Sequence, residues 1–204
     1  SSILAVSNAR FSDNTASSSG GAIYVYYNVT ATFTDTTFGG NSALYGGALI
    51  INGGNATFTR CNFSENSSSG SGAIGGALYI RDYNEYVSSA TFNNSAFTGN
   101  TTTGNGGAIQ IKDNSTATFN GCEFTNNSAS GNGGAIYAQA NATLNIEDTS
   151  FEGNTALCGG AIYGTANVTI NVSNSTFTSN SATSTDADTG GGAIYVIGTS
   201  TSSR

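Results

Sequence analysis

The chain contains no proline, histidine, methionine or tryptophan, and only 8% of its 204 residues are charged. Without histidine, and with a single lysine, general acid–base catalysis would depend on carboxylates alone. The five bases are too scattered to line a phosphate backbone, which argues against nucleic acid as a partner. They are Arg10, Arg60, Arg81, Lys112 and Arg204. No apolar run approaches the ~20 residues of a membrane-spanning helix, so we expect no membrane insertion by this segment.

The sequence also bears on whether the protein is secreted and in which compartment it acts. The first residues, SSILAVSNARF, lack the charged start and long apolar stretch of a signal peptide. Three cysteines are an odd and sparse set, and they do not predict a disulfide framework. The scarcity of lysine and the abundant Asn-x-Ser/Thr triplets suit an extracellular or cell-surface protein. The candidate glycosylation sites are Asn28, Asn55, Asn66, Asn100 and Asn167.

What the chain does contain is a repeat built from two motifs. The first is Gly-Gly-Ala followed by Ile or Leu, and it begins at Gly20, Gly46, Gly75, Gly106, Gly133, Gly159 and Gly191. The second is Phe-x-x-Asn followed by Ser or Thr, and its phenylalanines are Phe11, Phe38, Phe63, Phe97, Phe124, Phe151 and Phe177. The intervals between these phenylalanines are 27, 25, 34, 27, 27 and 26 residues. The repeat therefore indicates seven units of about 26 residues.

Within each unit apolar and polar residues alternate with a period of two, which is typical of strands and not of helices. Ala31 and Phe33, for example, alternate with Thr30, Thr32 and Thr34. Short strands joined by corners, with like residues at like positions, predict an all-β, right-handed parallel β-helix in which each unit is one coil. We expect residues 1–204 to form a single β-helix repeat domain without evident caps.

This fold explains the two motifs. The paired glycines are expected at a sharp corner that needs positive φ or close backbone approach. The phenylalanines should stack coil on coil in the core. The asparagines should lie at another corner, where asparagine tolerates left-handed φ, and should form an amide ladder. Cys61 and Cys122 occupy like positions two coils apart, too far for a disulfide, so all three cysteines, with Cys158, are expected to be unpaired.

The paired Gly-Gly-Ala-Ile/Leu and Phe-x-x-Asn motifs resemble the repeats of the chlamydial polymorphic membrane protein (Pmp) family, and the resemblance covers all seven units. That family comprises surface-exposed autotransporter passenger domains implicated in adhesion. The resemblance therefore implies a non-catalytic extracellular solenoid that acts in adhesion or as a fibre-forming element. Its partner would be a cell-surface receptor or a glycan.

Two features are candidates for contact with such a partner. The 34-residue unit carries an insertion that concentrates charge and aromatic rings, and its candidate contact residues are Arg81, Asp82, Tyr83, Glu85 and Tyr86. A column of outward-pointing tyrosines is the second candidate, because exposed aromatic patches often mark contacts. It comprises Tyr24, Tyr79, Tyr137, Tyr163 and Tyr195 and is interrupted by Ile50 and Gln110. Aromatic stacking between strands would explain the same column without a partner.

Two alternative functions follow from other outward columns. Threonine and asparagine form a double row that resembles ice-binding β-solenoids, with Thr32, Thr57, Thr91 and Thr118 in one of its columns. β-Branched threonine also suits any exposed strand. The second alternative is a polysaccharide-degrading enzyme, because some extracellular β-helices have that activity. No column here gathers acidic residues, so the main expectation is no enzyme, no cofactor and no bound metal.

The two ends of the sequence suggest a route to assembly. Residues ILAVSNARF match the second half of a coil, and GGAIYVIGTSTSSR matches the first half of one. Exposed terminal strands would invite pairing. We therefore expect either end-to-end self-association into a filament or adjoining repeats in a longer chain.

Overall fold

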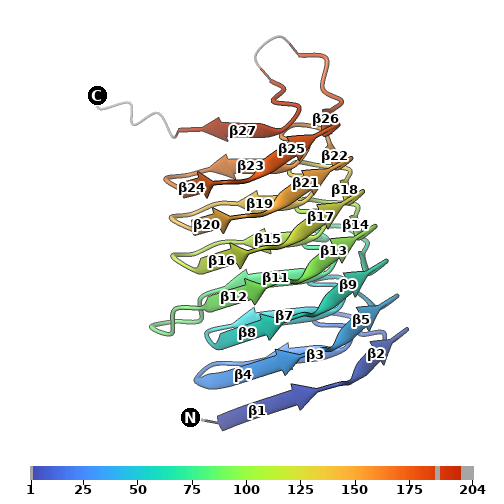
Figure 1. Ribbon diagram of the computed structural model, residues 1–204, viewed down its shortest axis with the longest axis vertical. Helices are drawn as coiled ribbons and strands as arrows, with labels where there is room; N and C mark the ends of the chain where they lie inside the picture. Colours follow the sequence, from blue (N-terminus) through green and yellow to red (C-terminus); the bar gives the residue numbers. More distant parts are fainter. Residues whose placement is uncertain (1, 187–188, 199–204) are drawn as a thin grey trace.

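The computed structural model describes residues 2–186 and 189–198, and its regular structure there consists of 27 β-strands (Figure 1). The strands form four parallel sheets that run the length of the stack. Each coil passes through the four sheets in turn and then enters the next coil. The predicted parallel β-helix of about seven coils is confirmed, because every strand pairs with its equivalents in the neighbouring coils.

We number the sheets 1 to 4 along the coil. Sheet 1 contains β1 (Ser2–Ser7), β4 (Val29–Thr34), β8 (Asn55–Thr59), β12 (Ser89–Asn93), β16 (Thr116–Asn120), β20 (Thr143–Glu147) and β24 (Thr169–Ser173). Sheet 2 contains β2 (Arg10–Ser12), β5 (Thr37–Gly39), β9 (Asn62–Ser64), β13 (Ala96–Thr98), β17 (Glu123–Thr125), β21 (Ser150–Glu152) and β25 (Thr176–Thr178). Sheet 3 contains β6 (Ser42–Ala43), β10 (Ser67–Ser68), β14 (Thr101–Thr102), β18 (Ser128–Ala129), β22 (Thr155–Ala156) and β26 (Ser181–Ala182). Sheet 4 contains β3 (Ile23–Val25), β7 (Leu49–Asn52), β11 (Leu78–Arg81), β15 (Ile109–Ile111), β19 (Ile136–Ala138), β23 (Ile162–Thr165) and β27 (Ile194–Ile197).

The core consists of columns of like side chains. The rings of the Phe-x-x-Asn motif stack nearly parallel from Phe11 to Phe177, with centroids 4.6–5.1 Å apart. A second column on sheet 1 stacks Phe33, Phe58, Phe92 and Phe119 at 4.7–5.0 Å. Rings of one column meet rings of the other edge to face, as between Phe92 and Phe97 at 5.3 Å. Aromatic rings favour both arrangements, so phenylalanine fills this core efficiently.

The predicted asparagine ladder is present between sheets 2 and 3. Asn100 is typical: its amide nitrogen Nδ2 donates to Asn127 Oδ1 at 2.9 Å and to the Phe63 carbonyl at 2.9 Å. Its Oδ1 accepts from the backbone N and the Nδ2 of Asn66, both at 3.0 Å. Our expectation of left-handed asparagine was wrong. Positive φ falls on the residue before the asparagine, such as Gly99 (64°), because the asparagine itself points into the core.

Both requirements predicted for the glycine pair are met, and the structure divides them between its two members. The first adopts positive φ, as Gly75 does at 61°. The second lies against the neighbouring coil, and a Cβ on Gly76 would fall 2.0 Å from the Gly107 carbonyl oxygen. Side chains at either position would strain the backbone or separate the coils. The alanine that follows is fully buried in most coils, as at Ala77.

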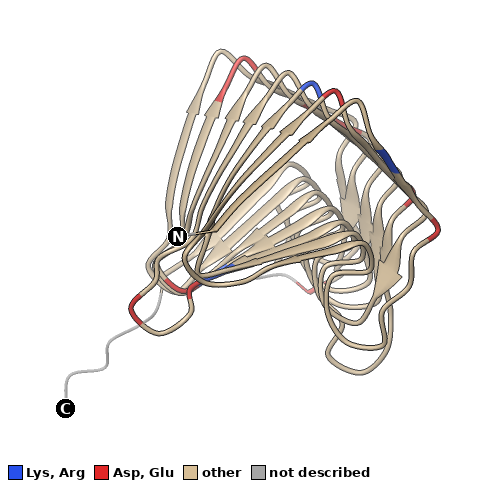
Figure 2. Cartoon of the chain, turned by 90° about the horizontal axis from the view of Figure 1, so that it is seen from below, with Lys and Arg blue, Asp and Glu red and all other residues tan. Residues whose placement is uncertain are grey.

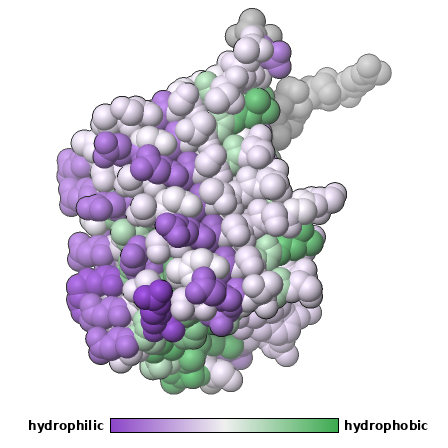
Figure 3. All heavy atoms as spheres, turned by 90° about the vertical axis from the view of Figure 1, so that its right-hand side faces the viewer, coloured by the Kyte–Doolittle hydropathy of each residue, from purple (hydrophilic) through white to green (hydrophobic). Residues whose placement is uncertain are grey.

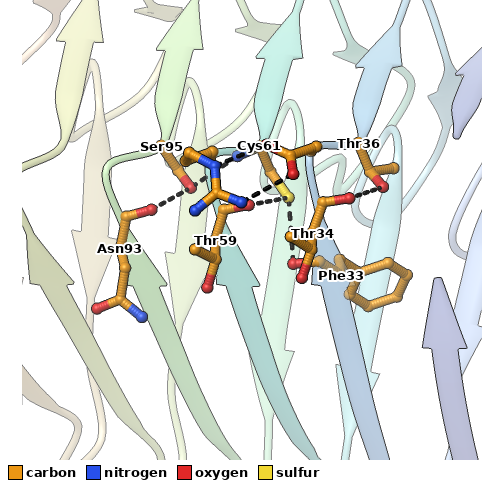
Figure 4. A network of polar contacts seen from close by, with 9 residues as sticks. Phe33, Thr34, Thr36, Thr59, Cys61, Asn93 and Ser95 are labelled. Carbon is orange, nitrogen blue, oxygen red and sulfur yellow. Dashed lines mark hydrogen bonds and ion pairs between the residues drawn. The ribbon is translucent and has the colours of Figure 1, made fainter. Parts of the chain in front are cut away.

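The corner between sheets 1 and 2 is lined by small hydroxyl and thiol side chains (Figure 4). The Cys61 thiol donates to the Phe33 carbonyl at 3.5 Å, and the Ser95 hydroxyl accepts from the Cys61 backbone N at 3.1 Å. Burial raises the pKa of Cys61, and it raises the pKa of the equivalent Cys122 to about 11. All three cysteines are free, as expected, and they are buried.

Candidate contact surface

The insertion in the 34-residue unit folds into a small hairpin after β11. Tyr83 and Tyr86 exchange two backbone hydrogen bonds of 3.0 Å, and Asn84 between them adopts a φ of 54°. The Asp82 carboxylate ties the base of the hairpin to the coils. Its Oδ1 accepts from the Ser88 backbone N at 3.1 Å and from the Ser115 hydroxyl at 2.8 Å. The hairpin therefore has a defined position on the surface.

The hairpin packs its rings onto tyrosines that lie two coils earlier. The Tyr83 ring lies 4.7 Å from Tyr26 and 5.6 Å from Tyr27, and the Tyr86 ring lies 5.4 Å from Tyr27. Tyr24 joins the cluster through Tyr26, at 5.5 Å. We call these five residues the tyrosine patch. Gly53, on the coil between them, has a φ of 77°, and a Cβ there would lie 2.8 Å from the Tyr83 Cβ. Glycine is therefore required beneath the patch.

The tyrosine patch is open to solvent. Tyr24, Tyr26, Tyr27 and Tyr86 are 38–47% exposed, and Tyr83 is half-buried beneath them. The hydrogen bond to Tyr83 and burial raise the pKa of Tyr26 to about 12, so its hydroxyl is protonated at neutral pH. The sequence analysis missed Tyr26 and Tyr27. The run Tyr-Val-Tyr-Tyr at residues 24–27 is a signal that could have identified them, because no other segment is so rich in aromatics.

Of the other predicted loop residues, Glu85 is exposed on the hairpin, whereas Arg81 belongs to sheet 4 and does not join the patch. Figure 2 shows that charged residues lie mostly on the bends of the coils. One such pair, Asp35 and Arg60, forms two hydrogen bonds of 2.7 and 2.8 Å across adjacent coils. Arg60 thereby lowers the pKa of Asp35.

The predicted outward column of tyrosines is real, but the expectation that it forms an exposed surface was wrong for its middle, since only Tyr24, Tyr163 and Tyr195 meet solvent. Tyr79 is only 4% exposed and Tyr137 only 8%, while Ile50 and Gln110 in the same column are buried. The chain before the second glycine pair lies over part of the outer face of sheet 4. The Tyr45 ring, for example, lies 6.3 Å from Tyr79.

The two ends of this column differ. At the C-terminal end Tyr137, Tyr163 and Tyr195 stack nearly parallel, with centroids 5.2 and 5.3 Å apart. At the N-terminal end the stack is broken, and a cavity of about 360 Å³ opens between sheet 4 and the chain that folds back over it. We call it the Arg81 cavity. It is lined by Ser18, Ser19, Tyr45, Ile50, Ile74, Tyr79 and Arg81.

The five candidate glycosylation sites divide into two groups. Asn28, Asn55 and Asn167 are exposed, and a glycan there remains a prediction. Asn66 and Asn100 are members of the asparagine ladder and are fully buried, with their Nδ2 atoms already hydrogen-bonded. The expectation of glycans at these two residues is therefore wrong for the folded chain.

The threonine and asparagine columns lie on the outer face of sheet 1. Thr32 is in register with Thr57, Thr57 with Thr91, and Thr91 with Thr118. The structure does not test whether they bind ice. Among residues 2–186 and 189–198, no three His, Cys, Asp or Glu side chains are grouped so that they could hold a metal ion. Nor does that part of the chain contain a helix that could cross a membrane.

Comparison with known proteins supports the fold and the repeat. A family model described as the right handed beta helix region matches residues 75–203, which is more than half of the chain. A model of the Chlamydia polymorphic membrane protein repeat matches residues 8–26. No curated protein and no solved structure matched the chain. The predicted resemblance to the Pmp family is thus confirmed at the level of the repeat. The chain belongs to the right-handed β-helix family and carries a repeat of the Pmp type.

Proposed function

We propose that the protein acts outside the cell as a non-catalytic adhesive solenoid and that the tyrosine patch is its contact surface. The Pmp repeat and the β-helix fit a surface-type solenoid, and Pmp proteins are generally associated with the outer membrane or cell surface. The partner would be a receptor or a glycan on another cell.

The observation that carries this proposal is the five-ring tyrosine patch on one side of the stack. Tyrosine provides a large, rigid and amphipathic contact area at a low cost in conformational entropy. Four of the five rings are more than a third exposed although each packs against another. The interior of the coils does not require these rings, because the patch lies outside the phenylalanine core. Exposed aromatic clusters of this kind often mark binding surfaces.

The test is a binding assay with beads coated with the purified chain, applied to epithelial cells and to immobilised glycans. Replacing Tyr26 and Tyr27 together by serine should reduce the bound fraction about tenfold or more, as expected for loss of central aromatic contacts. Tyr163→Ser is the matched control, because Tyr163 is a half-exposed tyrosine outside the patch. Equal binding by the double variant and the unaltered chain would refute the role of the patch.

Exposed apolar side chains at the two ends of the stack favour a second function, end-to-end assembly into a fibre. At one end, Leu4 and Val6 on β1 face the core but are only half-buried, whereas their partners in the next coil, Ala31 and Phe33, are fully buried. At the other end, Val196 on β27 is 56% exposed. Figure 3 shows hydrophilic side chains over much of one side of the stack, and hydrophobic atoms gather near its lower end. β1 and β27 are also the terminal strands of sheets 1 and 4, so each presents an unpaired edge. Such edges pair with further coils, from a second copy or from adjoining repeats.

Sedimentation velocity and electron microscopy show whether the ends pair with a second copy of the chain or only with adjoining repeats. If a second copy pairs with the ends, the purified chain should form threads whose length increases with concentration, and Val196→Lys should shorten them, because Val196 lies in an inward column that is uncovered at the end of the stack. Thr57→Lys, on the outer face of sheet 1, is the control for added charge. A chain that remains monomeric at every concentration would exclude assembly between copies.

A further inference from the structure

The Arg81 cavity contains a positive charge that no acidic side chain within residues 2–186 and 189–198 pairs with. The chain has a net charge of −7, so its few bases have many potential partners. Arg60 is paired with Asp35 at 2.7 Å, and Lys112 is paired with Asp113 at 3.1 Å. No ion pair within the described part of the chain includes Arg81, even though Arg81 is half-buried.

The adjacent carboxylate is held away from Arg81 by other groups. Asp82 Oδ1 accepts from the Ser88 backbone N and the Ser115 hydroxyl, and its Oδ2 accepts from Asn114 Nδ2 at 3.3 Å. These bonds orient the carboxylate toward the base of the hairpin. Asp82, the acidic neighbour of Arg81 in the sequence, therefore forms no ion pair with the Arg81 guanidinium.

The guanidinium is nevertheless held in place. Its Nε donates to Asn52 Oδ1 at 3.1 Å, and its Cζ lies 5.6 Å from the centre of the Tyr79 ring, within the range of a cation–π contact. Asn52 is buried and fixed in turn, because its Nδ2 donates to the Tyr24 hydroxyl at 2.8 Å. Among the described residues, no side chain accepts a hydrogen bond from the two Nη atoms of Arg81. An arginine oriented in this way presents a preorganised fork for a carboxylate.

The rest of the lining suits a sugar ring. The half-buried Tyr45 contributes an aromatic ring, the half-buried Ile74 contributes an apolar wall, and Ser18 and Ser19 contribute hydroxyls. The buried Tyr79 and Ile50 complete the lining. The volume of about 360 Å³ lies within the range of small-ligand sites, which combine apolar walls with a few polar groups that set orientation. Hydroxyls and aromatic faces recognise the polar edges and the apolar faces of a pyranose.

We propose that the Arg81 cavity binds a carboxylate-bearing sugar, such as a hexuronate or an N-acetylneuraminate residue, with the carboxylate on the Arg81 guanidinium. This inference rests on the adhesive function proposed above and specifies the class of ligand. Tyr24 links the two sites, because it belongs to the tyrosine patch and its hydroxyl holds Asn52. A glycan whose acidic residue occupies the cavity would extend toward the patch.

The test is saturation-transfer NMR and calorimetry with the unaltered chain and monosaccharide probes. Methyl glucuronide and the methyl glycoside of N-acetylneuraminate should bind with a Kd of about millimolar, as expected for ligands of this size. Methyl glucoside, which lacks the carboxylate, should bind at least tenfold more weakly. Arg81→Gln should weaken binding of the acidic sugars about tenfold to hundredfold, because a charge-assisted hydrogen-bonded pair is lost. The affinity of sodium acetate shows whether the carboxylate alone is recognised.

Lys112→Gln is the matched control, because Lys112 lies beside Tyr79 but is paired with Asp113. It should leave the affinity for acidic sugars within about twofold. The inference is overturned if neither acidic sugar binds, if acidic and neutral sugars bind equally, if acetate binds as tightly as the sugars, or if Arg81→Gln has no effect. Failure of the adhesive function gives a different result, in which acidic sugars bind but coated beads do not adhere.

Discussion

The phenylalanine column of sheet 2 and the tyrosine column of sheet 4 follow the same coils, yet they differ in regularity. The inner column has a phenylalanine in all seven coils, and its rings are evenly stacked. The outer column contains Ile50 and Gln110 among its tyrosines, and its rings stack only toward the C-terminal end. A packed interior tolerates little change in volume, whereas an outer face accepts side chains of different sizes, and its main requirement is that buried polar groups be hydrogen-bonded. The irregular end of the outer column is also where the Arg81 cavity and the tyrosine patch occur.

The largest expected effect comes from the inner column. Phe97→Ala should lower the free energy of unfolding by about 3–5 kcal/mol, because a fully buried ring would leave a cavity between Phe63 and Phe124. Urea denaturation followed by circular dichroism measures the loss. Tyr24→Ala, in the exposed part of the outer column, should cost less than half as much. Equal losses for the two variants would contradict the comparison.

The asparagine ladder should show the next largest effect. Asn100→Ala leaves the Phe63 carbonyl and the Asn66 backbone N without these partners, and we expect a loss of about 2–3 kcal/mol. Asn145→Ala is a control on the outer face of sheet 1, where the Asn145 Oδ1 accepts one exposed bond of 2.9 Å from Asn171. That control should cost less than about 0.5 kcal/mol. Both values are obtained from the same denaturation experiment.

A gain in stability is expected at an irregular position of the outer column. Gln110 is buried, and among the described residues its Oε1 has no hydrogen-bond partner. Gln110→Met keeps a similar shape and removes the cost of that desolvated oxygen, so stability should rise by about 1 kcal/mol. Gln110→Glu, which would bury a charge, should instead destabilise the fold. If the methionine variant is less stable than the unaltered chain, then Gln110 has a polar role.

The smallest effect is predicted for the surface pair of Asp35 and Arg60. Arg60 lowers the pKa of Asp35 below its ordinary value of about 3.9, so the pair contributes stability above that pH. The contribution is lost as the pH falls through the lowered pKa of the folded state. The unaltered chain should therefore be slightly more stable than Arg60→Gln at pH 7, and the difference should disappear at pH 2. A difference that persists at pH 2 would show that the charge on Asp35 does not matter.

Much of the fold could be predicted from the sequence because each feature repeats. Phe-x-x-Asn identified the core column and the amide ladder, and Gly-Gly-Ala identified the corner at which Gly75 has positive φ and Gly76 meets the next coil. The left-handed conformation was predicted for the asparagine of the motif, but the residue before it adopts this conformation, as Gly99 does before Asn100. The motif itself does not reveal which of two neighbouring residues turns the chain.

The candidate site was predicted less well, because it depends on segments that do not repeat. The insertion was predicted to be a contact loop, but its packing onto Tyr26 and Tyr27 depends on the path of the hairpin across two coils. The burial of Tyr79 likewise depends on the chain that folds back over sheet 4 at Tyr45. Alternation along a strand predicts which side a residue faces, but it does not predict what covers that side.

The sequence by itself determined the coil, because hydrogen-bonded strands at about 4.8 Å place like residues over like residues, and only the repeating pattern satisfies that register. Only the tertiary structure decided which outward side chains meet solvent. It brought Tyr83 and Tyr86 onto Tyr26 and Tyr27, and it placed Arg81 in a cavity without an ion pair to any described residue. The physical reason is that the exposure and ion pairing of a side chain depend on contacts between segments far apart in the chain. The coil depends only on the register of like residues in adjacent units, which every repeat encodes.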